Sequence, residues 1–467
     1  MSASSETEVL VVGAGPGGYV AAVRAGQLGL DVTLVDADAL GGTCLNYGCI
    51  PSKALLSAAE TVHDAGHRES MGIYADPYVD WDELLEWQSG VVSTLTDGVA
   101  HLCRDVGVEL VTGRARFVAD HEAVVAAPDG TERTLAFERA VIATGSRPVE
   151  PGAFPFDDDA VLTSRDVFSL SDIPGRLLVV GAGYIGLELA TLFSKLGTRV
   201  TVVELEGGVL PGWDGVLRRT IRDHLESLGV EFAFGERATA CTPTAGGVQV
   251  TTESEDGAET RREADRVAVA VGRRPVTDTV DVDAMGIELT ERGFVDVDEQ
   301  CRTSREHVFA VGDVAGEPML AHKASAEGVV AAETIAGREV SMSDRHVPAV
   351  VFTDPEVATV GLSEAEARQS GHDPVVGRMA FSNNGRALSA GQPDGFVRVV
   401  VDEQSEAVLG AQVVGRHASE LVGELAVALD ARLTARDVGG TIHAHPTLSE
   451  AVLEACEDAI DEAIHVP

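Results

Sequence analysis

Apolar runs and glycine-rich turns give the start of the chain a strand–helix–strand pattern. The apolar run Glu6–Val12 predicts a buried strand, and a G-x-G-x-x-G turn of Gly13, Gly15 and Gly18 joins it to a helix and a second strand ending at Asp36. In such a turn the first glycine makes the tight bend, the second lets the backbone approach a pyrophosphate, and the third lets helix and strand pack closely. The final carboxylate accepts hydrogen bonds from a ribose. The segment therefore predicts a dinucleotide-binding βαβ unit.

The whole pattern then occurs a second time. Strand Arg176–Val180 leads to Gly181, Gly183 and Gly186, and a helix follows before a strand that ends at Glu204. The spacing from the third glycine to the acid is the same in both units. A lone glycine motif would be a weak signal, but strand, helix, strand and acid together make a strong one. The second unit therefore predicts a second bound dinucleotide.

Each unit also closes with a similar strand and turn, Arg139–Pro148 in the first and Arg266–Pro275 in the second. Two full matches with matching ends indicate an internal duplication. We therefore predict an α/β fold with two Rossmann-like dinucleotide-binding domains. The first unit contains a long insertion that the second lacks, with helical patterns in Pro51–Val62 and Trp81–Val106.

The pattern changes from about Val347, where no further glycine fingerprint occurs. This C-terminal part alternates between apolar strand patterns that look antiparallel and amphipathic helix patterns. The strands are Phe396–Val401 and Val408–Val414, and the helices are Ser419–Ala431 and Leu448–Ala463. We therefore predict a third kind of domain, of the α+β type.

Two cysteines, Cys44 and Cys49, lie in the stretch Leu40–Ala54 (LGGTCLNYGCIPSKA), shortly after the acid of the first unit. A zinc site would need a second cysteine pair at ligand spacing, which the chain lacks, so we expect no metal. A static disulfide closing so short a loop would stabilise little. We therefore predict a redox-active pair beside a bound nucleotide cofactor. The other cysteines are scattered and read as ordinary reduced thiols: Cys103, Cys241, Cys301 and Cys456.

Two acidic residues are candidates for supporting roles. Glu450 follows His445 in the sequence HAHPTLSE, and a carboxylate at this spacing can hold one ring nitrogen of the histidine and leave the other for acid–base work. Asp313 follows a predicted strand, Val308–Val311, where it either bonds the sugar-alcohol chain of a cofactor or makes a plain turn. A redox pair needs a proton carrier, which strengthens the interpretation of His445.

The charge and composition of the chain limit the kinds of molecule that it is expected to bind. With 35 Lys and Arg against 75 Asp and Glu, the net charge of −40 disfavours nucleic acid. The basic residues are arginines except for Lys53, Lys195 and Lys323. An acidic, lysine-poor surface suggests adaptation to high salt or an acidic face for a basic partner. We interpret Lys195 as a surface residue. The retention of Lys53 argues for a compact ammonium that arginine cannot replace.

Three absences point to a cytoplasmic protein. The N-terminus has no basic region before its first apolar strand and does not read as a signal peptide. No apolar run reaches the length that spans a bilayer. Six cysteines in a chain of this size do not make a disulfide framework. We therefore expect a cytoplasmic location.

These motifs together resemble the flavin-dependent disulfide reductases, and specifically those that act on dihydrolipoyl groups. The resemblance covers nearly the whole chain and rests on the FAD fingerprint and six further segments: GGTCLNYGCIPSKAL, GAGYIGLELA, VGRRP, VFAVGDV, FTDPEVATVG and HAHPTLSEA. It implies an FAD-binding domain with the cysteine pair, an NAD-binding domain, a central domain that completes the FAD site, and a dimerisation domain. The expected boundaries are residues 1–150, 151–278, 279–346 and 347–467.

The resemblance also implies roles for individual residues. Cys49 would face the flavin, Cys44 would exchange with substrate, and Lys53 would lie beside the flavin, paired with Glu188. Lys323 falls in a segment that lines the flavin. The residues implied to bind FAD or NAD are Gly13, Gly15, Gly18, Asp36, Gly42, Thr43, Lys53, Ala115, Thr144, Gly145, Asp313, Ala321, Gly181, Gly183, Ile185, Gly186, Glu188, Glu204 and Gly272.

The implied reaction is oxidation of a protein-bound dihydrolipoyl group to its disulfide, with NAD⁺ as the final acceptor. The carrier would be the acyltransferase of a 2-oxo-acid complex or a glycine-cleavage H-protein, and His445 would serve the site of the partner subunit in a homodimer. The alternatives are a related reductase of another disulfide or a quinone, and a non-catalytic flavoprotein. Ser52 and the lack of basic residues near Glu204 argue against glutathione reductase-like enzymes. Tyr47 departs from the small aliphatic residue common in the family motif.

Overall fold

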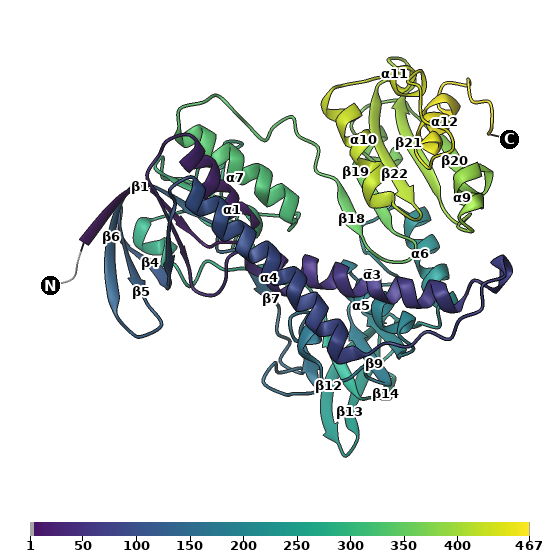
Figure 1. Cartoon of the computed structure of the whole chain (residues 1–467), viewed down its shortest axis with the longest axis horizontal. Helices are drawn as coiled ribbons and strands as arrows, with labels where there is room; N and C mark the ends of the chain where they lie inside the picture. Colours follow the sequence, from purple (N-terminus) through teal and green to yellow (C-terminus); the bar gives the residue numbers. More distant parts are fainter. Residues whose placement is uncertain (1–3, 467) are drawn as a thin grey trace.

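The computed structural model describes residues 4–466 (Figure 1). Its first sheet has seven strands in the order β3-β2-β1-β6-β5-β4, with β17 paired to β6. β1 is parallel to β2 and β6, and β17 is parallel to β6, so the carboxyl ends of these strands lie at one edge. The strand bounds are β1 Ser4–Val12, β2 Val32–Asp36, β3 Glu109–Thr112, β4 Arg114–Ala119, β5 Glu122–Ala126, β6 Glu132–Ile142 and β17 Val308–Ala310.

Helices cover one face of this sheet. Helix α1 (Pro16–Gln27) lies beside α7 (Ala321–Ile335), and both share a hydrophobic core with β1, β2 and the C-terminal half of α4 (Figure 1). The turn before α1 is tight because Gly13 has a φ of 103°. The predicted strand–helix–strand order is therefore observed, and the residues around 308–335 complete the first sheet and its cover rather than forming a sheet of their own.

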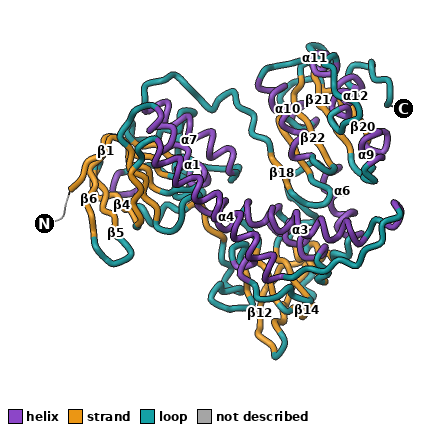
Figure 2. Tube along the Cα trace, in the orientation of Figure 1, coloured by secondary structure: helices purple, strands orange, loops and turns teal. Residues whose placement is uncertain are grey.

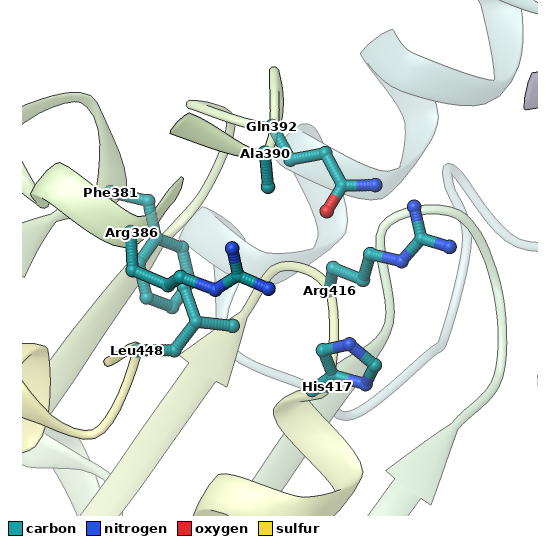
Figure 3. Close-up of a pocket in the computed structure, with 7 residues that line it drawn as sticks. All are labelled: Phe381, Arg386, Ala390, Gln392, Arg416, His417 and Leu448. Atoms are coloured by element: carbon teal, nitrogen blue, oxygen red, sulfur yellow. The ribbon is translucent and has the colours of Figure 1, made fainter. Parts of the chain in front are cut away.

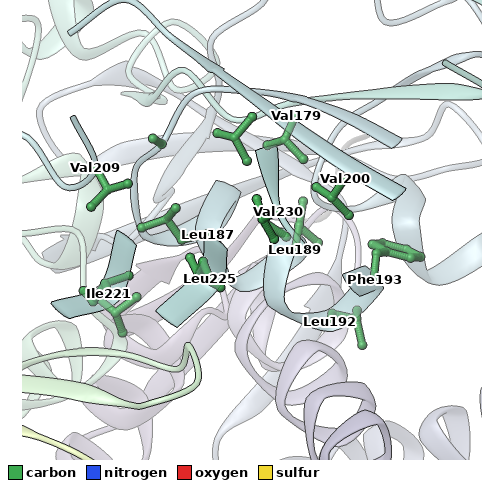
Figure 4. Packing of buried hydrophobic residues seen from close by; sticks show 14 of the residues in the cluster. Val179, Leu187, Leu189, Leu192, Phe193, Val200, Val209, Ile221, Leu225 and Val230 are labelled. Carbon is green, nitrogen blue, oxygen red and sulfur yellow. The ribbon is translucent and has the colours of Figure 1, made fainter. Parts of the chain in front are cut away.

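The second sheet repeats the arrangement with five parallel strands in the order β11-β10-β9-β15-β8. Helices α5 (Tyr184–Lys195) and α6 (Gly215–Ser227) pack on it through the apolar cluster drawn in Figure 4. A three-stranded antiparallel extension of β12, β13 and β14 follows. The strand bounds are β8 Val161–Leu162, β9 Arg176–Val180, β10 Arg199–Glu204, β11 Glu231–Phe234, β12 Glu236–Thr244, β13 Gly247–Ser254, β14 Glu259–Ala264 and β15 Arg266–Val269.

The closing turns of the two duplicated units pair with each other. β7 (Ser146–Pro148) and β16 (Arg273–Pro275) form a two-stranded antiparallel sheet centred on the pair Arg147 and Arg274. These segments occupy equivalent positions in the two units, so the duplicated halves meet through their matching ends. This contact holds the carboxyl edges of the two nucleotide-binding sheets close to one another.

The insertion of the first unit forms three helices, α2 (Gly42–Tyr47), α3 (Cys49–Gly66) and α4 (Trp81–Asp105). The start of α3 differs from the predicted start at Pro51, because a proline in the first turn of a helix removes an N–H that has no partner there. α4 begins as predicted, where the Asp80 side chain accepts a hydrogen bond from the backbone N–H of Glu83 at 3.2 Å.

The C-terminal part is an antiparallel five-stranded sheet in the order β18-β19-β22-β21-β20, with helices packed on it (Figure 2). The two predicted strands are confirmed as β21 and β22. The last helix was predicted at Leu448–Ala463 but spans only α12 (Glu450–Asp458), because the residues before it form the His445 loop and Asp461 adopts a left-handed φ of 59° beyond it. The remaining bounds are β18 Ala349–Val351, β19 Val357–Gly361, β20 Pro374–Ala380, β21 Phe396–Asp402, β22 Val408–Val414, α8 Glu364–Gln369, α9 Gly385–Ser389, α10 Ala418–Asp430 and α11 Ala435–Gly439.

Within residues 4–466, no helix has the length and apolar character that a bilayer-spanning segment requires.

Candidate active site

The two cysteines of the insertion meet across the junction of α2 and α3. Both are half-buried reduced thiols in hydrogen-bond contact with each other. The hydrogen bond from Cys44 lowers the pKa of Cys49 to about 7, with help from the Lys53 ammonium and against the effect of burial. The same hydrogen bond and burial raise the pKa of Cys44. The pair therefore has one stabilised thiolate, on Cys49, and one thiol, on Cys44.

Lys53 joins the insertion to the second dinucleotide-binding unit. Its Nζ lies 2.7 Å from Oε2 of Glu188 on α5, a carboxylate with an 8% exposed side chain. The other oxygen of Glu188 accepts a hydrogen bond from the backbone N–H of Phe352 at 3.1 Å, and the ammonium lies 4.4 Å from the centroid of the Phe352 ring. The pairing of Lys53 with Glu188 that the sequence suggested is therefore present in the structure.

The glycines of both fingerprints have the three different surroundings that the motif requires. A Cβ on Gly13 would lie 2.2 Å from the backbone oxygen of Ala143, and one on Gly18 would lie 1.8 Å from that of Gly13. A Cβ on Gly15 would meet no atom within 4 Å, so this backbone faces open space at the start of α1. The second fingerprint repeats this pattern at Gly181, Gly186 and Gly183. Both turns thus fit a pyrophosphate at a helix N-terminus.

The acids at the ends of β2 and β10 are held in matching ways. The carboxylate of Asp36 accepts backbone hydrogen bonds from Ala14 at 2.5 Å and from Asp38 at 2.7 Å. Glu204 accepts the equivalent bonds from Ala182 at 2.6 Å and from the residue two positions after it at 2.8 Å. Burial raises the pKa of Asp36 despite these bonds. Each carboxylate is therefore fixed beside its glycine turn, where a ribose would lie.

Several predicted residues gather at the carboxyl edge of the first sheet. Asp313 follows β17 and accepts a hydrogen bond from the Ser146 hydroxyl, whose oxygen accepts one from Nε of Arg273 at 2.7 Å. Thr144 donates to the backbone oxygen of Val276 at 2.6 Å. The predicted residues that lie in the turns or helix starts of this region are Gly13, Gly15, Gly18, Asp36, Gly42, Thr43, Thr144, Gly145, Asp313 and Ala321. The ends of β1, β6 and β17 bring them together.

The side chains of two other predicted residues, Ala115 and Ile185, have little access to a bound cofactor. Ala115 is buried in β4 opposite Val125, so only its backbone is left to contact a ligand. Ile185 is partly buried in the core of α5. Gly272 lies in the turn between β15 and β16 with a φ of 120°, a conformation that suits glycine.

The histidine site lies in the C-terminal part. Nδ1 of His445 is 2.8 Å from one oxygen of Glu450, and the other oxygen accepts the backbone N–H of Thr447 at 2.7 Å. These bonds hold the pKa of Glu450 below its usual range, although burial works against them. The side chain of His445 is 78% exposed, and its Nε2 makes no hydrogen bond with residues 4–466. In Figure 1, α12 lies in the C-terminal part, away from α4, which contacts α2.

Comparisons with known proteins agree with this geometry. Residues 7–328 match the model of the pyridine nucleotide-disulphide oxidoreductases, and residues 347–456 match the dimerisation domain of the same family. The chain belongs to this family. The family resemblance, the fold class with two Rossmann-like domains, and the expected cofactors FAD and NAD are thereby confirmed.

Individual oxidoreductases of this family are similar over almost their full lengths. The dihydrolipoyl dehydrogenase of Halobacterium salinarum is 54% identical over 99% of this chain and 98% of its own. That of Haloferax volcanii is 54% identical over 98% and 97%. Among solved structures, LpdA from Mycobacterium tuberculosis has a TM-score of 0.91 at 27% identity, covering 97% of this chain and 99% of that one. The flavoprotein disulfide reductase RclA from Escherichia coli has a TM-score of 0.85 at 27% identity, covering 96% and 99%.

The interpretation of Lys195 as a surface residue is wrong. Its side chain is 3% exposed, and its Nζ lies 2.6 Å from Oδ2 of Asp354 in the C-terminal part. Lys323 is also paired, with Nζ 2.7 Å from Glu327, whose carboxylate accepts the backbone N–H of Gly312 at 2.7 Å. All three lysines of this oxidoreductase therefore pair with carboxylates, each at a contact between distant segments or beside the Asp313 turn.

Sequence reasoning missed Tyr184, the first residue of α5. Burial raises the pKa of its phenol to about 12, and the phenol interacts electrostatically with Arg273, Asp313, Glu188 and Cys49. Tyr184 directly follows Gly183 of the second glycine turn, and 38% of its surface is exposed. An aromatic residue inside a glycine fingerprint was the available signal.

Two cavities within the described residues are lined by residues other than the two cysteines. A small pocket in the C-terminal part is lined by two arginines, Arg386 and Arg416, that point into the same space beside His417 (Figure 3). A larger cavity of about 580 Å³ shares Arg416 and is lined by the ends of α3 and α5 together with Asp354. The described residues contain no group of three or more His, Cys, Asp or Glu side chains that could hold a metal ion.

Proposed function

We propose that this chain is a dihydrolipoyl dehydrogenase, which oxidises a dihydrolipoyl group to lipoyl disulfide and reduces NAD⁺ to NADH. The observation that carries the proposal is the unequal thiol pair. Cys49 has a pKa of about 7 and contacts Cys44, on a loop that touches the first glycine turn at Gly15 and reaches α5 through the Lys53–Glu188 pair. FAD, when bound, accepts an electron pair from this dithiol and delivers it to NAD⁺. In this direction the substrate dithiol reduces the oxidised Cys44–Cys49 pair by thiol–disulfide exchange, and the remaining residues serve that exchange.

Each residue of the site has a separate role in this reaction. Cys44 exchanges with the substrate sulfur, and Cys49 is the thiolate on the flavin side. His445 of the partner subunit takes and returns the substrate proton, because its Nδ1 is held by Glu450 and its Nε2 is free. Lys53, which is ion-paired with Glu188, places a compact ammonium beside the Cys49 thiolate.

The cofactors occupy the two fingerprints. Gly15 and Asp36 hold FAD, with Asp313 on its sugar-alcohol chain, and Gly183 and Glu204 hold NAD. The domain division that serves this arrangement is an FAD domain of residues 1–150, an NAD domain of residues 151–278, a central domain of residues 279–346 and a dimerisation domain of residues 347–467. The open space beside Gly15 and Gly183 and the anchored acids support this assignment.

The enzyme works as a homodimer with shared sites. The dimerisation domain and the exposed His445 support a two-fold arrangement in which each histidine faces the thiols of the other chain. The substrate is the lipoyl arm of an acyltransferase or of a glycine-cleavage H-protein. The setting is the cytoplasm, where thiols stay reduced. The acidic composition and the relatives in Halobacterium and Haloferax support a halophilic enzyme.

A substrate panel tests the proposal. The purified holoenzyme in molar KCl should reduce NAD⁺ with dihydrolipoamide at a kcat/KM at least a hundredfold above that for NADH- or NADPH-driven reduction of glutathione disulfide, coenzyme A disulfide or a quinone. Serine at either cysteine should abolish the dihydrolipoamide reaction. Efficient turnover of another disulfide, with dihydrolipoamide a poor substrate, would assign the chain to a different reductase.

A further inference from the structure

Tyr47, the residue that departs from the family motif, belongs to a closed triangle of side chains. It is the last residue of α2, between the two cysteines, and its hydroxyl donates to Oδ1 of Asp38 at 3.2 Å. The guanidinium of Arg165 lies over the Tyr47 ring, with Cζ 3.6 Å from the centroid, and its NH2 is 3.5 Å from Oδ2 of Asp38. The three residues come from the redox loop, the turn after β2 and the segment that leads into the second unit.

The triangle fixes one end of α2 while packing fixes the other. Burial and the Asp38 carboxylate raise the pKa of Tyr47, so its phenol stays protonated and can donate. Asp38 is itself bound through its backbone N–H to the carboxylate of Asp36 at 2.7 Å. At the start of α2, a Cβ on Gly42 would lie 2.6 Å from the Cα of Gly15, so the two backbones are in close contact. The short helix that carries Cys44 is therefore held against the first nucleotide turn at both ends.

We propose that Tyr47, held by Arg165 and Asp38, is a positioning residue that sets the dithiol–disulfide equilibrium of Cys44 and Cys49. The inference rests on the proposed redox function of the pair. Oxidation of the Cys44 thiol and the Cys49 thiolate forms one S–S bond and releases two electrons and one proton, which together would reduce NAD⁺ to NADH by way of the flavin. A clamped α2 keeps the two sulfurs in contact after reduction, which raises the effective concentration of one thiol at the other. The clamp therefore favours the disulfide.

The proposal predicts a set of shifts in the reduction potential of the pair. Tyr47→Val removes both contacts of the ring and should move the equilibrium toward the dithiol by about two- to fivefold, the range for an exposed cation–π contact. For a two-electron couple this raises the potential by about 10–20 mV. Tyr47→Phe keeps the ring under Arg165 and should therefore raise the reduction potential by less than Tyr47→Val does. Arg165→Leu should act like Tyr47→Val, and the double variant should shift no further than either single one.

A second arginine cluster supplies the matched control. Arg292 lies over the buried Phe294 ring at 5.4 Å and pairs with Glu317 at 2.7 Å, and the two charged side chains are exposed. Arg292→Leu should leave the potential of the cysteine pair unchanged.

The experiment equilibrates each holoenzyme in dihydrolipoamide–lipoamide buffers, quenches with acid, alkylates free thiols and counts modified Cys44 and Cys49 by mass spectrometry. Equal potentials in wild type, Tyr47→Val and Arg165→Leu, or additive shifts in the double variant, would overturn the inference while leaving the redox pair in place. A wild-type pair that fails to titrate as a two-electron couple would instead overturn the proposed function. If Tyr47→Val does not fold, the comparison of Tyr47→Phe with Arg165→Leu still decides.

Discussion

Replacing Asp354 should destabilise this protein more than replacing the lysine with which it pairs. The Lys195 side chain is 3% exposed and that of Asp354 is 33% exposed, with 2.6 Å between Nζ and Oδ2. Asp354→Asn leaves a buried ammonium without its carboxylate, which should cost about 3–5 kcal/mol. Lys195→Met leaves a carboxylate that water reaches, so its cost should be about 1–2 kcal/mol, within the range of ordinary substitutions.

The assay is the thermal midpoint of unfolding in molar KCl at one protein concentration. Each kcal/mol lowers the midpoint by about 2–4 °C for a domain of 150–250 residues, so Asp354→Asn should lower it by roughly 6–20 °C and Lys195→Met by roughly 2–8 °C. The double variant should resemble Lys195→Met, because no buried charge then remains. Arg432→Met is the control, since the Arg432–Asp344 pair is 80% and 86% exposed at 3.6 Å and should contribute less than about 1 kcal/mol. A loss for Lys195→Met equal to or larger than that for Asp354→Asn would refute the reasoning.

Four further predictions concern the reaction. Cys44→Ser should keep the thiolate-to-flavin charge-transfer absorbance and Cys49→Ser should lose it; the reverse result would exchange their roles. In the reduced enzyme, the alkylation rate of Cys49 should rise with pH through about 7 while Cys44 reacts slowly, because the pKa of Cys49 is lowered and that of Cys44 is raised. Lys53→Met should move this pH profile of Cys49 to higher pH. An unchanged profile would show that the ammonium does not lower the pKa of Cys49. NAD⁺ should be preferred to NADP⁺ by at least tenfold in kcat/KM, because Glu204 repels a 2′-phosphate; equal values would contradict this. Doubly tagged mixed dimers of Cys49→Ser and His445→Gln chains should have about half the wild-type activity, and activity no higher than either single mutant would refute the shared site.

The sequence located the local elements of the nucleotide sites well. β2 ends at Asp36 and β10 ends at Glu204, as predicted, because glycine turns and strand-ending acids are fixed by short-range backbone geometry. The hydrogen bond between His445 and Glu450 was also predictable, since both residues lie in one loop. These features depend on the spacing of residues along the chain, which can be read directly from the sequence.

The features that failed depend on contacts between distant segments. The pairing of β7 with β16 joins residues more than a hundred positions apart and has no local pattern. Lys195 is the last residue of α5, where a basic residue is common, and its partner Asp354 lies in another domain, so no local pattern indicates its burial. The end of α12 was misplaced for a related reason, because apolar residues beyond Asp458 continue the helical period while the backbone turns away. Contacts between distant segments override the local signal at β7, β16 and Lys195, whereas at the end of α12 the local backbone turns at Asp461.

The distribution of the three lysines connects the surface of this protein to its chemistry. Arginine carries the positive charge on the acidic exterior, whereas Lys53, Lys195 and Lys323 each pair with a carboxylate at 2.6 to 2.7 Å. A compact ammonium fits a narrow, partly buried contact that a planar guanidinium would not. Buried pairs are screened less by salt than exposed ones. The three lysine–carboxylate pairs are therefore weakened less by high salt than pairs on the surface. In such salt, the ammonium of Lys53 can still stabilise the Cys49 thiolate.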